Sequence, residues 1–173
     1  MRIHLSDVET YKIAWAAADR CEFKQNNGVV NKTKVDQKRN NFELTKEGFM
    51  GEWAVSLTLN IPVNTDLYLG PDAGYDLEFQ GYTIDVKTTR AKYLLFQSID
   101  HFKADVAVLV KVVNDYEVDV VGMISREKFI EIHEMKDFGY GNQCVVPPEK
   151  LLPIEEFERY ARRYPKYQSI EQS

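Results

Sequence analysis

The sequence predicts a single domain of mixed α+β (α/β) class, spanning residues 1–173, in which a central mixed β-sheet is flanked by helices. Its length of 173 residues and its hydrophobic share of 44% are sufficient for one sizeable core. Two segments with helical spacing precede a β-hairpin pattern. The run "DVAVLVKVV" (105–113) is rich in β-branched residues, which is typical of a buried strand.

The helices can be located from their periodicity and end signals. The first is expected over residues 7 to about 24, with Asp7 as its N-terminal cap. The second covers about 45–60 and ends before Pro62, because proline cannot continue a helix. A third begins after Ser125, a favoured cap residue, and a fourth follows an extended stretch within 147–164.

The strands follow from alternation and turn residues. Residues 75–79 and 82–88 alternate apolar and polar side chains, and Gln80 and Gly81 between them suit a two-residue turn. Residues 105–113 and 116–124 read as two further strands joined by a tight turn. The stretch "KYLLFQS" (92–98) fits either a third strand or a short helix.

The hairpin brings charged side chains together. With a two-residue turn, Asp76 lies opposite Asp85, and one face carries only polar residues: Asp76, Glu78, Thr83, Asp85 and Lys87. Like charges directly opposite each other are destabilising, and a bound cation would remove the repulsion. The alternative is a solvent-facing polar side of the hairpin, on which Lys87 supplies the positive charge.

A third carboxylate stands on the second helix. Its apolar face consists of Phe49, Met50, Trp53, Ala54 and Leu57, and Glu52 is expected at the edge of that face. Gly48 and Ser56 are its neighbours one turn away, so nothing bulky screens it. Glu52 is therefore either a solvated boundary residue or a partner of the hairpin aspartates.

The motifs "GEWA", "GYDL" and "IDVKTT", from about Gly48 to Val113, resemble the PD-(D/E)xK nuclease superfamily. The resemblance implies a restriction-endonuclease-like core of a helix, a three-stranded hairpin unit, a second helix and a further strand. It aligns Asp76, Asp85 and Lys87 with the motif and Glu52 with the helix glutamate. No proline directly precedes Asp76, and Asp72 competes for the first position; Asp76 is preferred because it opposes Asp85.

The resemblance implies a magnesium-dependent, endonucleolytic deoxyribonuclease of the hydrolase class, with manganese as a possible substitute. Asp76, Asp85, the backbone carbonyl of Val86 and Glu52 would hold the metal, which can activate water and neutralise phosphate charge. Lys87 would orient the attacking water and offset phosphate charge. The preference for DNA over RNA rests on the resemblance alone.

Although the net charge is −5, two segments of the chain are locally basic. Residues 24–46 hold six basic and two acidic residues, and residues 159–166 hold four basic residues and no acid. Such segments suit phosphate contacts, and the alternative is that they are solvated loops and a solvated helix end. The residues expected to bind the nucleic acid are Lys34, Lys38, Arg39, Thr88, Thr89 and Arg90.

Other functions remain open at this level. The same chemistry could act on RNA or on free DNA ends, and a catalytically silent member of the fold could bind nucleic acid or protein. A homodimer would favour a paired cut in duplex DNA, and a monomer would favour nicking. Without an apolar run of membrane-spanning length or a signal-like N-terminus, a cytoplasmic protein without membrane contact is expected. Scattered cysteines and histidines argue against a zinc site.

Overall fold

The computed structural model describes residues 1–28, 40–65 and 74–166. The helices are α1 (Asp7–Asn26), α2 (Asn41–Leu59), α3 (Arg126–Ile132) and α4 (Ile154–Arg163). The strands are β1 (Arg2–His4), β2 (Leu77–Phe79), β3 (Tyr82–Thr89), β4 (Leu94–Phe96), β5 (Val106–Asn114), β6 (Glu117–Ser125), β7 (Glu134–Asp137) and β8 (Asn142–Val146). No helix within these ranges is long and apolar enough to cross a membrane.

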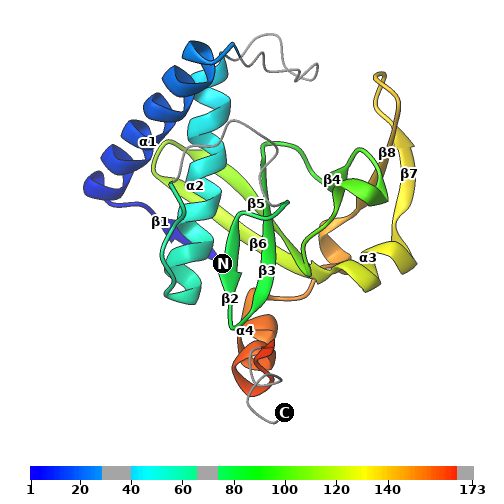
Figure 1. The fold of residues 1–173 in the computed structure, drawn as a ribbon. Helices are drawn as coiled ribbons and strands as arrows, with labels where there is room; N and C mark the ends of the chain where they lie inside the picture. Colours follow the sequence, from blue (N-terminus) through cyan, green and yellow to red (C-terminus); the bar gives the residue numbers. More distant parts are fainter. Residues whose placement is uncertain (29–39, 66–73, 167–173) are drawn as a thin grey trace.

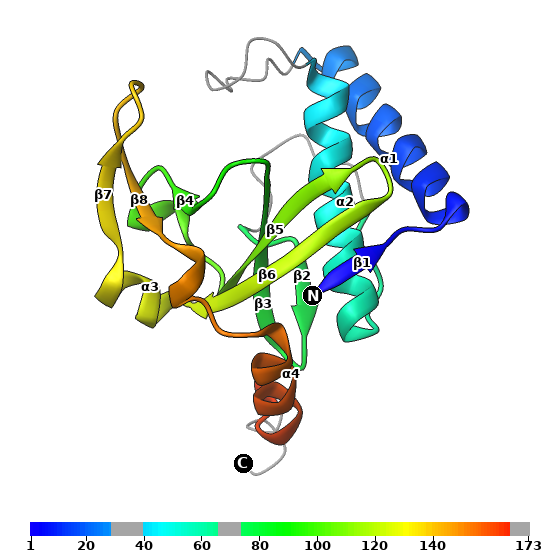
Figure 2. The ribbon, with the colours of Figure 1, turned by 180° about the vertical axis from the view of Figure 1, so that it is seen from behind.

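Two sheets organise the chain. The central sheet has the mixed order β1-β6-β5-β3-β2, in which β3 runs parallel to β5 and the other pairs are antiparallel. A smaller antiparallel sheet has the order β4-β8-β7. Figures 1 and 2 show α1 and α2 on one side of the molecule and the smaller sheet on the other. The predicted mixed class, with a central mixed sheet flanked by helices, is confirmed.

Each face of the central sheet supports its own apolar cluster. One cluster joins Ile84, Val86 and Val108 of the sheet to residues of α1, α2 and α4. The other joins Ala107 and Leu109 to β4, α3 and β8. Because side chains of a strand alternate between faces, odd-numbered residues of β3 point towards the second cluster.

Helix α1 begins with a capping box one residue before the predicted cap. Ser6 Oγ accepts a hydrogen bond from the Glu9 backbone N–H, and the Glu9 carboxylate accepts one from the Ser6 N–H. The prediction of Asp7 as cap was wrong, because Ser6 is the residue that has a glutamate three positions later.

Helix α2 is longer and more buried than its sequence pattern indicated. It begins at Asn41, because Asn40 caps it by accepting the Glu43 N–H. Leu57, expected on the packed face, is exposed, whereas Glu52, expected at an open edge, is only 8% exposed. Glu52 is covered because α2 lies between α1 and the central sheet, so two sides of the helix are packed.

The hairpin register is confirmed. Phe79 pairs with Tyr82 and Leu77 with Ile84, and the turn residues Gln80 and Gly81 both have positive φ, of 52° and 82°. Positive φ at both central positions is the type I′ geometry that matches the strand twist. The ladder ends at the pair of Leu77 and Ile84, and Asp76 lies just before β2 with its N–H donating to the Ile84 carbonyl at 2.8 Å. The pairing of Asp76 with Asp85 lies beyond the ladder and stays a prediction.

The connection from β3 to its parallel neighbour β5 differs from the expected core. The resemblance implies a helix there, but the chain forms β4 and a short 3₁₀ helix, Ile99–His101. "KYLLFQS" is therefore a strand, and it pairs with β8 instead of joining the central sheet. The sequence interpretation did not include β1, β7 or β8, whose short lengths give little periodicity.

A close approach of α2 to β3 fixes the relation of helix and sheet. A Cβ added at Gly51 would overlap Thr88 Oγ1 and would lie 3.0 Å from Thr88 Cβ. A Cβ added at Gly48, one turn earlier, would meet no atom within 4 Å. Of these two glycines only Gly51 is thus required by packing, and it brings α2 directly onto the carboxyl end of β3.

We expect Gly51→Ala to lower the free energy of unfolding by about 1–3 kcal/mol, since α2 must move away from Thr88. Gly48→Ala is the matched control and should raise stability by up to about 1 kcal/mol through helix propensity. Urea unfolding monitored by circular dichroism measures both, and adding Thr88→Ala should restore part of the loss. Equal effects of the two glycine variants would show that the contact does not determine the packing.

Candidate functional site

Strand β3 carries an acidic and a basic residue in direct contact. The Asp85 carboxylate is only 5% exposed, and its Oδ1 lies 2.6 Å from Lys87 Nζ. The Lys87 ammonium also lies 4.8 Å from the centre of the Phe96 ring on β4, while part of its side chain reaches solvent. A buried carboxylate requires compensation, and Lys87 provides it from the same strand face.

Asp76 is oriented by the backbone of the same strand. Its N–H donates to the Ile84 carbonyl at 2.8 Å, and its Oδ2 accepts the Val86 N–H at 2.6 Å. Strand β2 pairs with β3 only as far as Ile84, so the Asp76 carboxylate takes the place of the next ladder partner. Asp76 therefore binds the backbone of β3 between Asp85 and Lys87, whose side chains contact each other.

Glu52 approaches from a different element. It is buried on α2, which covers the face of β3 that carries Ile84 and Val86. Asp85 and Lys87 occupy the alternate positions, on the face of Phe96. The four predicted catalytic residues thus come from two places: three from the β2–β3 hairpin, and Glu52 from α2, which packs on the other face of β3.

The donor chemistry of these residues suits magnesium. Carboxylate and carbonyl oxygens are its preferred protein ligands, and it retains several waters, so few protein ligands suffice. Asp76, Asp85 and the Val86 carbonyl supply such oxygens from one end of the hairpin. Within the described ranges, no group of three or more His, Cys, Asp or Glu side chains is arranged to hold a metal ion.

The predicted substrate-binding residues that follow Lys87 make contacts within the chain. Thr88 Oγ1 lies 3.4 Å from the Gly48 carbonyl, and Thr89 Oγ1 accepts the Ala91 N–H at 2.9 Å. Arg90 Nε donates to the buried Glu47 carboxylate at 2.8 Å, and half of the arginine side chain stays exposed. Lys34, Lys38 and Arg39 lie outside the described residues.

The basic segment at the end of α4 is partly neutralised. Arg159 pairs with Glu156 at 2.6 Å, Arg162 with Glu158 at 2.9 Å and Lys166 with Asp105 at 2.6 Å. Three of its four basic side chains therefore form ion pairs within the chain.

A second basic and aromatic group lies beside β4. Lys136 Nζ on β7 donates to Tyr93 Oη at 3.2 Å and lies 4.4 Å from the centre of that ring. Lys92 lies over the same ring at 5.6 Å, and Phe138 at the tip of the β7–β8 hairpin packs 6.1 Å from it. The hydrogen bond that Lys136 donates to Tyr93 raises the pKa of Lys136. We call these four residues the hairpin cluster.

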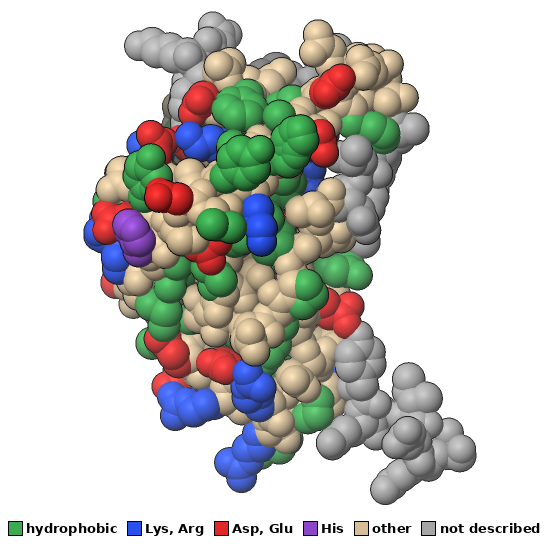
Figure 3. Space-filling model, turned by 90° about the vertical axis from the view of Figure 1, so that its left-hand side faces the viewer, with side chains coloured by type: hydrophobic (Ala, Val, Ile, Leu, Met, Phe, Trp, Pro, Cys, Tyr) green, Lys and Arg blue, Asp and Glu red, His purple; other side chains and the backbone are tan. Residues whose placement is uncertain are grey.

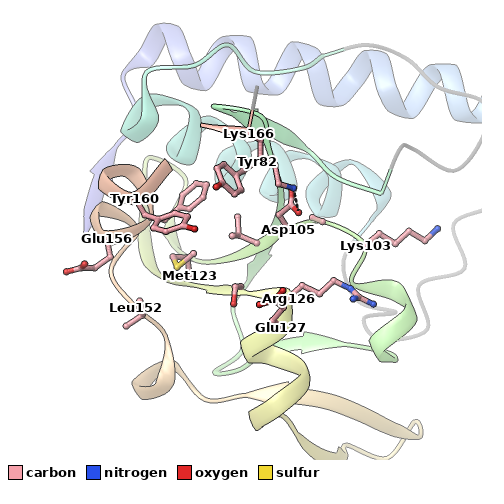
Figure 4. A pocket seen from close by; sticks show the side chains of 14 residues that line it. Tyr82, Lys103, Asp105, Met123, Arg126, Glu127, Leu152, Glu156, Tyr160 and Lys166 are labelled. Atoms are coloured by element: carbon pink, nitrogen blue, oxygen red, sulfur yellow. Dashed lines mark hydrogen bonds and ion pairs between the residues drawn. The ribbon is translucent and has the colours of Figure 1, made fainter. Parts of the chain in front are cut away.

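A cavity of about 1010 Å³ lies elsewhere, at the amino ends of β3 and β5 (Figure 4). Tyr82, Tyr160 and Met123 surround its centre, and Asp105 and Arg126 line its other wall. None of the four predicted catalytic residues lines it. It is also at the opposite end of β3 from Thr88 and Thr89, although ligands of open α/β sheets usually bind beyond the carboxyl ends of strands.

Asp105 joins the two parallel strands at this cavity. Its Oδ2 accepts the Thr83 N–H at 2.9 Å and the Thr83 hydroxyl at 3.0 Å, while Oδ1 binds Lys166 at 2.6 Å. Burial raises the pKa of Asp105, but the bonds from Lys166 and Thr83 outweigh it and hold that pKa below its usual value. The sequence interpretation treated Asp105 only as the start of a strand; a polar residue before an apolar run was the sole signal.

No protein-family model matches this chain, and the searches of curated proteins and of solved structures found no significant match.

We expect Asp105→Asn to lower the free energy of unfolding by about 1 kcal/mol at pH 7, because the charged bond to Lys166 is lost. A carboxylate with a depressed folded pKa stabilises above its unfolded pKa, near 4, and loses this effect as pH falls through the folded value. The difference from wild type at pH 7 should therefore shrink in acid, as the pH falls through the folded pKa of Asp105. Chemical denaturation at both pH values measures it.

Asp115→Asn is the matched control, because the exposed Asp115 carboxylate also pairs with a lysine, Lys46, at 3.2 Å. Its removal should change stability by less than about 0.5 kcal/mol. A difference for Asp105→Asn that is the same at both pH values would contradict the linkage.

Proposed function

We propose that this chain is a metal-dependent nuclease, built on a restriction-endonuclease-like core, that cleaves DNA endonucleolytically by phosphodiester hydrolysis. The observation that carries the proposal is the contact between the buried Asp85 carboxylate and Lys87, with the Asp76 carboxylate held at the N–H of Val86, the residue between them. Like charges placed close together lower stability unless a cation offsets them. Two carboxylates at the same stretch of β3, beside a partly exposed lysine, therefore support a chemical role.

Asp76, Asp85, the Val86 carbonyl and, directly or through water, Glu52 would hold magnesium, or manganese in its place. When bound, such an ion neutralises phosphate charge and lowers the pKa of a water molecule. The Val86 N–H fixes the direction of the Asp76 carboxylate at 2.6 Å, so this ligand needs little reorganisation on binding.

Lys87 would act on the attacking water and on the phosphate. Its ammonium is held by Asp85 on one side and by the Phe96 ring at 4.8 Å on the other, so it has a defined position. Partial exposure leaves it able to reach a substrate. A positioned ammonium can hold the water by hydrogen bonding and offset the charge that develops on the phosphate.

The hairpin cluster supports a nucleic-acid partner. β4 links it to the site, since Phe96 contacts Lys87 and pairs with Cys144 of β8. Two lysines beside the half-buried Tyr93 ring and the exposed Phe138 ring can contact phosphates and stack on bases. The cluster and the Asp85–Lys87 pair are therefore both connected to the same short strand.

We expect Lys87→Ala to abolish metal-dependent cleavage while the protein stays folded. Wild type and variant are incubated with supercoiled plasmid and with labelled single- and double-stranded DNA and RNA, in magnesium, manganese or chelator. Lys128→Ala is the matched control, because Lys128 also pairs with a carboxylate, Glu131 at 2.9 Å, but lies on α3. It should cleave as wild type does.

Other outcomes point to the alternative functions. Cleavage of RNA alone, or only from free ends, would replace the DNA endonuclease by an RNA-directed or exonucleolytic enzyme. If the folded protein cleaves nothing, the Asp85–Lys87 pair is a structural ion pair in a catalytically silent binding module.

We expect the double variant Lys92→Ala/Lys136→Ala to bind single-stranded DNA more weakly and with a smaller dependence on salt. Each lost phosphate contact should reduce the slope of log K against log salt by about 0.7. Fluorescence anisotropy in chelator, where no metal-dependent cleavage occurs, gives this slope, with Lys128→Ala again as control. An unchanged slope would remove the hairpin cluster from the binding surface.

A further inference from the structure

The outer face of α1 carries large apolar side chains that the rest of the described chain leaves exposed. Val8, Tyr11 and Trp15 are 63%, 71% and 58% exposed. Figure 3 shows the side of the molecule on which α1 lies, with hydrophobic side chains gathered over it. Single exposed apolar residues are common, but three large ones in a row on one helix are a candidate contact surface.

Helical geometry shows that this stripe has no part in holding α1 on the domain. Val8, Tyr11, Trp15 and Ala18 follow the spacing of three and four residues that forms one seam along a helix. Ile13 and Ala17 are fully buried in the core cluster, on the opposite side of α1. The seam therefore remains available to a partner.

We propose that α1 pairs with α1 of a second copy of this chain, antiparallel, about a two-fold axis between residues 16 and 17. Trp15 then lies against Ala18 of the second copy, and the reverse contact forms on the other side of the axis. A large ring against a small side chain keeps the helix separation even. This inference does not depend on the proposed nuclease function.

Charge complementarity selects this arrangement. Lys12 and Asp19 are exposed and flank the seam on the same side, one heptad apart. In the proposed pairing, Lys12 lies within about two residues, or 3 Å along the axis, of Asp19 in the second copy, and the pair forms twice. The opposite charges of this flank therefore match each other across the axis.

Two other pairings fit less well. Moving the axis to residue 13 stacks Tyr11 on Trp15 and brings the two copies of Lys12 together, which is repulsive. A parallel pairing sets Trp15 against Trp15 and Ala18 against Ala18, so the helices would be held apart at one layer and underpacked at the next.

The interface is small, so the dimer should be concentration-dependent. α1 has 20 residues, and a helix of that length spans about 30 Å. One helix pair buries less area than the interfaces of permanent dimers, which predicts dissociation in the micromolar range.

Sedimentation equilibrium of the full chain, from about 10 to 500 µM, covers that range. Wild type should form dimers. Trp15→Glu should be monomeric with an unchanged melting temperature, while Ile130→Glu, at an exposed apolar position on α3, should dimerise as wild type does.

A charge exchange tests the register. Lys12→Glu and Asp19→Lys should each weaken the dimer several-fold, because each places like charges across the axis, and the double variant K12E/D19K should restore it. A parallel pairing would not give this rescue. A wild-type protein that is monomeric at the highest concentration, or a double variant no better than the single ones, would overturn the proposal.

Discussion

The arrangement around β3 depends on compensating the buried Asp85 carboxylate. Removing an ion from water costs several kcal/mol in a real protein, and only a close opposite charge offsets that loss. Lys87 meets this need at 2.6 Å because alternate residues of a strand share a face. Its ammonium then lies over Phe96, and Phe96 belongs to β4, which begins the smaller sheet. The Asp85–Lys87 ion pair on β3 thus helps to position the smaller sheet through the contact of Lys87 with Phe96.

The opposite face of β3 obeys a steric constraint. Thr88 occupies the space that a side chain at Gly51 would need, so α2 can approach the strand closely only at that position. Glu47, one turn earlier on α2, binds Arg90 just beyond the end of β3. Helix and strand are therefore joined by packing at Thr88 and by an ion pair at Arg90. These two contacts fix the position of α2 along β3, and they therefore fix the position of Glu52 relative to that strand.

The local parts of this architecture could be read from the sequence, and the non-local parts could not. Gln80 and Gly81 fixed the turn, so alternation alone predicted the pairs of Phe79 with Tyr82 and of Leu77 with Ile84. Glu52 is buried on α2, which contacts both α1 and the central sheet, and a single-helix pattern contains neither contact. The partner of β4 is β8, almost fifty residues later in the chain, and three-residue strands have too little period to reveal such a pairing. Asp105 was missed for the same reason, because its partner Lys166 is sixty-one residues away.

The proposed dimer contact on α1 and the proposed catalytic residues Asp85 and Lys87 lie on different faces of the molecule. α1 packs on α2, and α2 covers the Ile84 and Val86 face of the central sheet. Asp85 and Lys87 belong to the other face, together with β4 and the hairpin cluster. In a dimer formed through α1, both copies would direct these faces away from the two-fold axis. Such a dimer would not set two sites on opposite strands of one short duplex, so each proposed site would cut by itself.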